Sequence, residues 1–372
     1  MKILLTANYK RGIGGINAQV DLLYTYLNQE NGIKADIFST KGNPLRRCIA
    51  FLKLLCQARR YDILHIHACS YWGMVPAVLG IIAGKLWRKR TIITYHGGEA
   101  KEYFSKHAAF VRRWLSRADE VIVLSGFLKE IFDQHQIPCV VIPNIVVLRP
   151  QTERTTTIAP KFISIRHLEP LYNITCVLQA YEQVLKQYPE ASLDILGQGS
   201  MRAELEAYVQ EHKLTGGVTF VGQVPNDKIY DYFANASIML SAPKIDNMPV
   251  SILEAMNAGL LVISSRVGGV PYMINDGLGF SGRPSSYGLG FSGVENSAAE
   301  TTASSLIASL PDRPNKATGL LFESDNADEL AEKMIWALEH PEEVKQIIAQ
   351  AQVDVQKYAW KNVKQQLMKV YE

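Results

Sequence analysis

Residues 246–259, DNMPVSILEAMNAG, combine two acidic side chains with residues that mark the ends of a helix. Pro249 suits the first turn of a helix, where its missing N–H costs nothing, and Gly259 suits the position just past a helix end. We therefore expect a helix of about nine residues between them. The first N–H groups of such a helix have no intrahelical acceptor, so this end favours a phosphate bound by Met248, Val250 and Ser251.

The two acids of this segment lie at different depths along the expected helix. Glu254 lies about one turn in, where a carboxylate can accept hydrogen bonds from a ribose diol. Asp246 lies just before the expected helix, at the entrance to the site, where it can hold the hydroxyl groups of a sugar. The residue types alone also allow a second interpretation, in which Asp246 caps the helix and Glu254 faces solvent.

A glycine loop, residues 12–15 (GIGG), follows the first expected strand and precedes a helix from Asn17 to Leu27. Glycine lets the backbone approach a phosphate or a sugar closely, so Gly14 and Gly15 are candidate ligand contacts. The loop is not the dinucleotide-binding fingerprint, because Asn17 stands where that motif needs its last glycine. A plain turn between strand and helix is the alternative.

Two further side chains follow expected strands, at the end of a parallel sheet where α/β proteins build their sites. His96 comes after the strand 91–94, although a lone histidine is more often structural. Arg166 ends the strand 162–165, and its fixed guanidinium fork could grip a diphosphate through two hydrogen bonds. Both are therefore candidate site residues.

The segment from Asp246 to Glu254 resembles the Glu-x7-Glu signature of glycosyltransferase family 4. Members of that family have the GT-B fold, in which two Rossmann-like α/β domains face each other across a cleft. Their second acid binds the ribose of a nucleotide-sugar donor, their first acid contacts the transferred hexose, and the backbone between the two cradles the diphosphate. The resemblance implies that Glu254 is the ribose ligand, that Asp246 is the sugar contact, and that the cradle is formed by Asn247, Met248, Pro249 and Val250.

Other landmarks of the family occur in the same order. Tyr95-His96-Gly97 resembles the His-Gly element that contacts the donor sugar near the reaction centre. The pair Gly14 and Gly15 resembles glycines that lie against the donor. A weaker match is the run 268–271 (GGVP), after which this chain has Tyr272 where the family commonly has Glu.

The chain departs from the family pattern at two positions that matter for the donor. The first acid is Asp246 rather than Glu, which leaves the identity of the hexose open. No lysine follows Arg166 before Lys186, although the family has one shortly after this arginine. Phosphate binding is then expected to rest on Arg166 and the helix end, with Tyr172 or Asn173 as substitutes.

The chain contains no Asp-x-Asp pair, which transferases of the other major fold use to bind a metal ion. We expect no cofactor and no required metal, because the helix dipole and Arg166 can neutralise the leaving diphosphate. Retention of the anomeric configuration is implied by the resemblance alone. With no evident carboxylate nucleophile, we favour departure of the nucleotide and approach of the acceptor hydroxyl on one face of the sugar.

The elements that must position these residues alternate between β-rich runs and helical patterns, which indicates βα units on mostly parallel sheets. The pattern stops at a polar stretch, 151–157, and restarts after it. We expect an acceptor-side Rossmann-like domain at 1–148, a nucleotide-sugar-binding domain at 149–354, and a C-terminal helix at 355–372 that packs back on the first. Residues 278–317 are rich in Gly, Ser, Thr and Ala and resemble an insertion, either a flexible surface excursion or a lid.

Charge is distributed unevenly along the chain. Residues 1–148 carry 20 Lys and Arg against 10 Asp and Glu, whereas residues 149–372 carry 19 against 26. A basic first domain favours an anionic partner, such as a phosphorylated lipid carrier or a membrane surface. Residues 46–60 predict a helix whose cations adjoin an apolar stripe, and this helix either lies on an anionic membrane or packs the stripe on the sheet. The stripe comprises Leu45, Ile49, Leu52 and Cys56.

No stretch approaches the roughly 18 apolar residues of a membrane span, and the apolar start at Ile3–Ala7 is shorter than a signal-peptide core. The five cysteines form no CxxC pair and are expected to be reduced thiols. We therefore expect a cytoplasmic protein that can lie at the inner face of the membrane.

Together these features favour a retaining glycosyltransferase that moves a hexose or hexose derivative to a polysaccharide or lipid-linked saccharide, in bacterial cell-surface polysaccharide synthesis. One alternative is a sugar-nucleotide epimerase or phosphorylase on a similar double scaffold. The other is a non-catalytic protein whose basic half binds a membrane or nucleic acid. We expect no nucleic acid partner, because aromatic and basic residues are not interleaved in a recognisable module.

Overall fold

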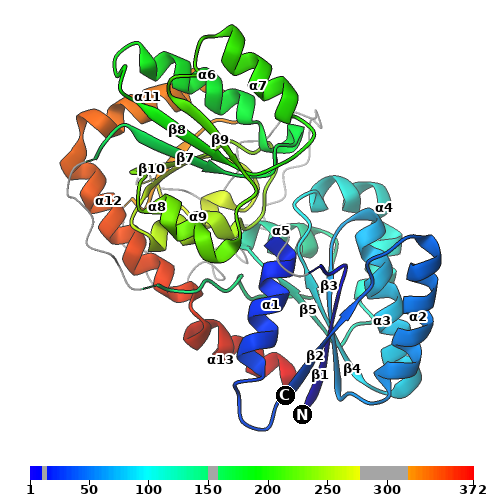
Figure 1. The fold of residues 1–372 in the computed structure, drawn as a ribbon. Coiled ribbons are helices and arrows are strands. Elements are labelled where there is room, and N and C mark those ends of the chain that lie inside the picture. The colour runs from blue at the N-terminus through cyan, green and yellow to red at the C-terminus, as the bar shows by residue number, and fades with distance from the viewer. Residues whose placement is uncertain (11–14, 150–157, 277–316) are drawn as a thin grey trace, which may run out of the picture.

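The computed structural model describes residues 1–10, 15–149, 158–276 and 317–372. Gly14, the predicted linker at 151–157 and nearly all of the predicted insertion at 278–317 lie outside these residues. The chain forms two lobes, each a parallel sheet flanked by helices (Figure 1). The predicted α/β fold of two Rossmann-like domains is thereby confirmed.

The first lobe is built on a six-stranded parallel sheet in the order β2-β1-β3-β4-β5-β6. Every residue of β3 is buried, as expected for a strand covered on both faces. The strands are β1 (Lys2–Ala7), β2 (Lys34–Ser39), β3 (Ile63–Ala68), β4 (Arg90–Tyr95), β5 (Glu120–Val123) and β6 (Val140–Val141). The helices are α1 (Gly15–Leu27), α2 (Pro44–Ala58), α3 (Val75–Trp87), α4 (Ala100–Leu115) and α5 (Gly126–Gln134).

The second lobe has a six-stranded parallel sheet in the order β12-β11-β10-β7-β8-β9. Its strands are β7 (Lys161–Ile165), β8 (Ser192–Leu196), β9 (Val218–Gly222), β10 (Ile238–Ser241), β11 (Leu261–Ser265) and β12 (Leu320–Phe322). Its helices are α6 (Ile174–Leu185), α7 (Arg202–Glu211), α8 (Ile229–Phe233), α9 (Val250–Asn257), α11 (Ala327–Glu339) and α12 (Pro341–Asp354). The strand order reverses between β7 and β10, so the loops after these two strands border a natural binding crevice.

Both faces of the second sheet carry an apolar core. Phe162 of β7 packs with α6 and α11, whereas its neighbour Ile163 packs with α9 and α12, the alternation that a strand imposes. Ile252 and Leu253 fix α9 in this second core, and both are fully buried. The packing therefore sets where the N-terminus of α9 lies.

The last helix, α13 (Trp360–Tyr371), lies against the first lobe, beside α1 (Figure 1). Val363 and Leu367 share a core with β1 and α1, and Trp360 stacks on Tyr26 with 5.1 Å between ring centroids. The chain thus passes between the lobes twice. Val146, from the first passage, forms a parallel bridge with Ala359, from the second.

Helix α2 turns its predicted apolar stripe outward. Leu45 is 70% exposed, Ile49 45% and Leu52 65%, and Cys56 is exposed as well. The helix buries Leu54 and Ala58 instead. The interpretation in which the stripe packs on the sheet is therefore wrong, because α2 uses a different face for that contact.

Within the described part of the chain, no helix has both the length and the apolar character needed to cross a bilayer.

Candidate functional site

Helix α9 begins one residue later than the sequence suggests. Pro249 is its N-cap, with φ −67° and ψ 117°, and Val250 is its first residue. A proline in the cap position has no N–H to leave unpaired. The N–H groups of Val250 and Ser251 open the helix without intrahelical acceptors. The donors expected to bind phosphate are therefore present at this helix end.

Glu254 lies one turn inside α9 and is partly buried. Burial raises the pKa of its carboxyl to about 7, although the charge of Arg149 opposes the shift. The Arg149 guanidinium stands over the ring of Tyr230, 4.2 Å from its centroid, and Asn257 donates to the Tyr230 hydroxyl at 3.3 Å. A ligand hydroxyl at this position would meet a carboxylate that becomes charged near neutral pH.

Arg166 and Asp246 form an ion pair at the point where the order of the second sheet reverses. Arg166 Nη1 lies 2.9 Å from Asp246 Oδ2, and only 9% and 17% of the two side chains are exposed. Arg166 also donates from Nη2 to Ser241 Oγ at 2.9 Å, and Ser241 is fully buried. With two fixed partners, the guanidinium is held in one orientation at the crevice.

The loop that carries Asp246 rests on a pair of glycines. A Cβ on Gly268 would lie 1.9 Å from the Asp246 carbonyl oxygen, and one on Gly269 would lie 2.0 Å from that of Asn247. Gly268 also has a φ of +49°, which favours glycine. The Gly269 N–H donates to the Asp246 carbonyl at 3.1 Å. The weak GGVP match therefore has a structural reason, because only glycine permits this approach.

The two residues after Asp246 turn toward the first lobe. Ser125 Oγ donates to Asn247 Oδ1, and Asn144 Nδ2 donates to the Met248 carbonyl at 2.9 Å. The Asn247 N–H is itself occupied, since it donates to Asp246 Oδ1 at 2.8 Å. Asn247 and Met248, which were predicted to bind the nucleotide-sugar, therefore join the two lobes. Nothing in the sequence indicated that Ser125 and Asn144 would be their partners.

His96 follows β4 and lies near the Asp246 loop. A Cβ on Gly98 would lie 3.7 Å from the Asp246 Cα, so the loops after β4 and β10 are in contact. His96 Nε2 is 2.9 Å from Nδ1 of His67, at the end of β3. Burial, with a smaller contribution from His67, lowers the pKa of His96 well below its ordinary value. The structure thus places a neutral imidazole at the start of the loop of the first lobe that contacts the Asp246 loop of the second.

The two glycine-loop residues contribute less to the described site. Gly15 opens α1, and a Cβ there would meet no atom within 4 Å. Gly14 lies outside the described residues. The close backbone approach predicted for this loop therefore stays a prediction.

The residues expected to replace the missing lysine point in different directions. The Arg166 guanidinium lies 5.5 Å from the centroid of the Tyr172 ring, so Tyr172 belongs to the cluster. Asn173 donates to Asp325 Oδ1 at 2.8 Å, and Lys244 pairs with the same carboxylate at 2.8 Å. Lys244 thus places an ammonium group at this edge of the sheet. The sequence analysis missed Lys244, and only its position after β10 could have indicated it.

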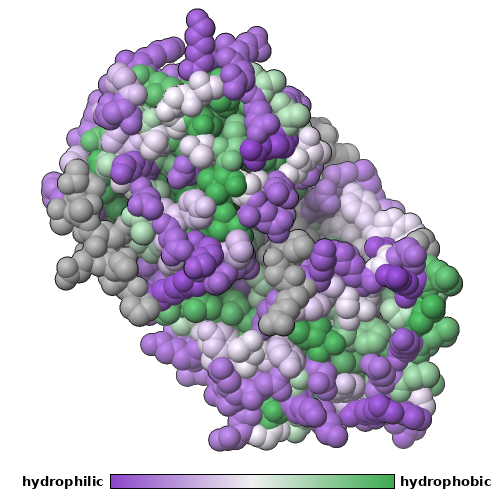
Figure 2. All heavy atoms as spheres, in the orientation of Figure 1, coloured by the Kyte–Doolittle hydropathy of each residue, from purple (hydrophilic) through white to green (hydrophobic). Residues whose placement is uncertain are grey.

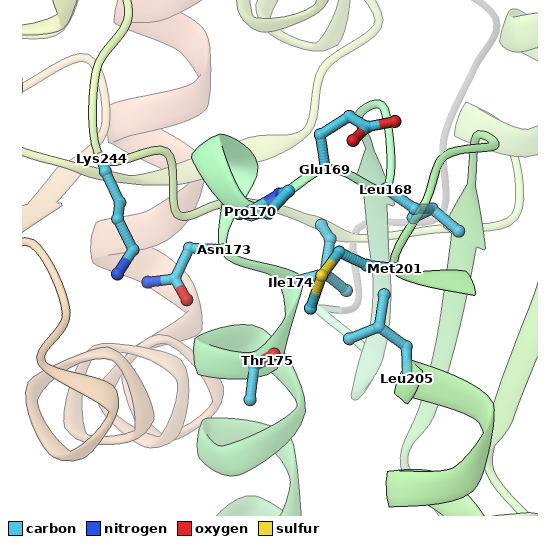
Figure 3. A pocket seen from close by; sticks show the side chains of 9 residues that line it. All are labelled: Leu168, Glu169, Pro170, Asn173, Ile174, Thr175, Met201, Leu205 and Lys244. Atoms are coloured by element: carbon cyan, nitrogen blue, oxygen red, sulfur yellow. The ribbon is translucent and has the colours of Figure 1, made fainter. Parts of the chain in front are cut away.

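A cavity of about 180 Å³ adjoins this cluster (Figure 3). Figure 3 shows Lys244 and Asn173 directed toward each other on one side, with Met201 and Leu205 on the other. The lining residues come from the segment after Arg166, from the starts of α6 and α7 (Met201 is the N-cap of α7) and from the loop just before Asp246. They are Leu168, Glu169, Pro170, Asn173, Ile174, Thr175, Met201, Leu205 and Lys244. The cavity therefore belongs to the second lobe and lies next to the ion pair rather than on it.

Two family profiles match the chain. The one described as Glycosyltransferase Family 4 matches residues 32–149, and the one described as Glycosyl transferases group 1 matches residues 151–287. The second match contains Arg166, Asp246 and Glu254, and the two together include parts of both lobes. The chain belongs to glycosyltransferase family 4.

Curated relatives of this family 4 chain match it over part of their length. The gpi3 component of phosphatidylinositol N-acetylglucosaminyltransferase from Schizosaccharomyces pombe is 27% identical over 137 residues, which are 36% of this chain and 30% of the relative. Alpha-monoglucosyldiacylglycerol synthase of Streptococcus pneumoniae is 24% identical over 252 residues, which are 60% of this chain and 56% of the relative. The chain thus spans less than two thirds of either relative.

Solved structures resemble the family 4 chain over its whole length. Anabaena Alr3699/HepE in complex with UDP-glucose superposes with a TM-score of 0.74 at 17% identity, covering 100% of this chain and 99% of that one. The lipopolysaccharide outer core galactosyltransferase WaaB superposes with a TM-score of 0.66 at 15% identity, covering 100% and 99%. This likeness confirms the GT-B fold that the sequence resemblance implied.

One family position has a different use in this family 4 chain. Tyr272, where the family commonly has Glu, donates its hydroxyl to Glu130 Oε1 on α5. Its ring lies against Gly126, where a Cβ would approach it to 2.3 Å. Tyr272 therefore ties the second lobe to the first.

Proposed function

We propose that this chain transfers a hexose or hexose derivative from a nucleotide-sugar donor to a hydroxyl group of an acceptor. The Arg166–Asp246 pair carries the proposal, because it places a fixed cation and an acid at the switch point of the second sheet, next to the loop of His96. Helix α9 adds N–H donors and Glu254 to the same edge. A nucleotide-sugar matches this order of groups: ribose at Glu254, diphosphate at the helix end and Arg166, sugar between Asp246 and His96.

The proposed reaction forms a bond between the acceptor oxygen and the anomeric carbon while the bond from that carbon to the diphosphate breaks. Arg166 and the N-terminus of α9 stabilise the negative charge that develops on the diphosphate, so no metal ion is required. The proton of the acceptor hydroxyl passes to the departing diphosphate. Departure and approach on one face of the sugar retain the anomeric configuration.

The proposed acceptor is a polysaccharide or lipid-linked saccharide of a bacterial cell surface, reached at an anionic membrane. Two relatives support a lipid acceptor by name, one as a monoglucosyldiacylglycerol synthase and one as a component of phosphatidylinositol N-acetylglucosaminyltransferase. The basic first lobe supports the anionic partner, because its cations complement lipid phosphates.

The surface proposed to meet the membrane is formed by α2 and α3. Hydrophobic side chains gather over α2 (Figure 2), where Leu45 and Leu52 are 70% and 65% exposed, and Leu86 of α3 is 61% exposed. Trp87 of α3 donates to the Leu55 carbonyl of α2 at 2.7 Å, which makes the two helices one surface. Exposed cations on and just after these helices, Arg46, Lys53 and Arg88, complete the pattern of an interfacial helix pair.

Incubation with a panel of donors tests the transfer. Purified protein is mixed with UDP-glucose, UDP-galactose, UDP-N-acetylglucosamine, GDP-mannose or ADP-glucose and a lipid-linked saccharide, and nucleotide release and added hexose mass are measured. We expect at least one donor to be used, with loss of transfer in Arg166→Ala and normal transfer in Lys161→Ala, an exposed cation at the start of β7. Failure of the wild-type protein with every donor would refute the proposal.

Sedimentation with lipid vesicles tests the membrane surface. We expect binding to vesicles of phosphatidylglycerol and phosphatidylcholine, and binding at least about tenfold weaker in the double variant Leu45→Gln, Leu52→Gln, because two leucines no longer enter the interface. The matched control is Val353→Gln, since Val353 is 66% exposed on α12 of the other lobe. Equal binding by all three proteins would show that α2 does not dock on the lipid.

A further inference from the structure

Three histidine rings form a continuous array that ends at the candidate site. His65 and His67 lie on β3, and His96 follows β4. The His65 and His67 rings stack with 4.8 Å between centroids, and those of His67 and His96 with 5.1 Å. His67 Nδ1 lies 2.9 Å from His96 Nε2. The ring at the site is therefore held by a second ring, which is held by a third.

The inner end of the array is pinned by hydroxyl groups. His65 Nδ1 lies 2.7 Å from the Tyr371 hydroxyl, and His65 Nε2 lies 2.7 Å from Thr94 Oγ1. Both polar atoms of that ring are thus satisfied, and both hydroxyls are buried in the first lobe. His67 is stacked between His65, whose two ring nitrogens have partners, and His96, to which it is hydrogen-bonded, so its ring is held by both neighbours.

One buried nitrogen of the array has no partner among the described residues. His67 Nε2 is buried and has no hydrogen bond to any described residue, and the residue is only 7% exposed. Burial lowers the pKa of His67 to about 4 and also lowers that of His96. At neutral pH both rings are therefore uncharged, and each carries one proton on one of its two nitrogens.

The missing partner decides where the two protons lie. If His96 donated from Nε2, His67 would carry its own proton on Nε2, a buried N–H without an acceptor. Such an orphan donor is rarer and more costly than an unused lone pair. His67 therefore donates from Nδ1 to His96 Nε2. The proton of His96 is then on Nδ1, its other nitrogen, for which the described residues offer no hydrogen-bond partner.

We propose that His67 is a positioning residue that holds His96 as an Nδ1–H donor toward an oxygen of the transferred sugar. The inference rests on the proposed function, because the accepting oxygen belongs to the donor substrate. His67 touches no substrate itself. It acts by fixing both the ring angle of His96 and the nitrogen that bears the proton.

The tautomer can be measured without any substrate. Protein labelled with ¹⁵N-histidine is studied by long-range ¹H–¹⁵N correlation, which distinguishes a protonated ring nitrogen from a bare one, and His96→Asn identifies the signals of His96. We expect His96 to be protonated on Nδ1 in the wild-type protein and to lose this preference in His67→Leu. Protonation of His96 on Nε2 in the wild-type protein would overturn the proposal.

Three replacements of His67 separate positioning from packing. The amide nitrogen of Asn stands where histidine has Nδ1, whereas that of Gln reaches the place of Nε2. With the best donor of the panel, we expect His67→Asn to keep kcat within about threefold of wild type, and His67→Gln and His67→Leu to lower kcat about tenfold or more with little change in KM. Thermal unfolding is recorded for each variant, so that a loss of folding is recognised.

The two arms separate the failure of this inference from the failure of the proposed function. Wild-type protein that uses no donor contradicts the function, and the tautomer measurement still decides the role of His67. Active wild-type protein with His67→Asn no better than His67→Gln, at equal stability, contradicts the role of His67 alone.

Discussion

Replacing Glu254 by glutamine removes a carboxyl whose charge is expected to govern the binding of ribose. Burial raises the pKa of this group to about 7, so the carboxylate is lost as the pH falls through neutrality. The carboxyl is about 10% ionised at pH 6 and about 90% at pH 8, and a site that needs the carboxylate gains about ninefold in apparent affinity between them. In Glu254→Gln we expect weak binding that does not change over this range.

Calorimetric titration with UDP-glucose, GDP-glucose and ADP-glucose at pH 6, 7 and 8 measures the effect. Intact sugar nucleotides are used because a terminal phosphate titrates near pH 6 and would add its own dependence. His67 and His96 stay neutral over this range because burial lowers the pKa of each. Glu204→Gln, at an exposed position of α7, is the matched control. Wild-type affinity that is equal at pH 6 and pH 8 would refute the reasoning.

The same pKa has a consequence for stability. Between pH 4.5, the ordinary pKa of the group, and pH 7, the folded protein keeps a proton that the unfolded chain releases. The contribution of Glu254 to the free energy of unfolding therefore falls as the pH rises through this window, by at most about 3 kcal/mol. Glu254→Gln should lack this loss, so its melting temperature should exceed that of the wild type at pH 8 and approach it at pH 5.

Four further predictions concern the diphosphate and sugar positions. Arg166→Lys keeps the charge but loses the planar fork, so we expect the donor KM to rise about tenfold, and unchanged steady-state kinetics would argue against a bidentate contact. Asp246→Ala should lower kcat more than it lowers donor affinity. Gly268→Ala forces a Cβ onto the Asp246 carbonyl, so it should slow transfer and lower the free energy of unfolding by about 1–3 kcal/mol in chemical denaturation. Wild-type activity and stability in these variants would count against the placement of this loop. EDTA should leave the rate of transfer within about twofold of the untreated rate. If EDTA abolished transfer and a divalent ion restored it, a metal ion would neutralise the diphosphate in place of Arg166 and the helix end.

The sequence predicted the strands well because buried parallel strands are short apolar runs. The strands expected at 91–94 and 162–165 are present as β4 (Arg90–Tyr95) and β7 (Lys161–Ile165). β12 was missed, because its three residues are too few to show a period. Pro249 and Gly259 located α9, since helix ends depend on local chemistry, although Pro249 caps the helix instead of lying in its first turn.

The partners of the site residues could not be predicted in the same way. Ser241 and Arg166 come from β10 and the end of β7, which pair in the sheet but lie 75 positions apart in the chain. His67 meets His96 only because β3 and β4 are neighbours. The outward stripe of α2 was also undetermined, because a helix with two apolar faces buries whichever one the sheet accepts, here that of Leu54.

The two passages of the chain between the lobes are tied together where the Val146 N–H donates to the Tyr358 carbonyl at 3.0 Å. A single covalent connection would allow one lobe to rotate in any direction relative to the other. Two connections that are hydrogen-bonded side by side restrict the rotation of the lobes to a single hinge axis. Any opening and closing of the lobes would then bring the two halves of the site back to the same alignment, so the approach of the loop after β4 to the Asp246 loop depends on a contact outside the site.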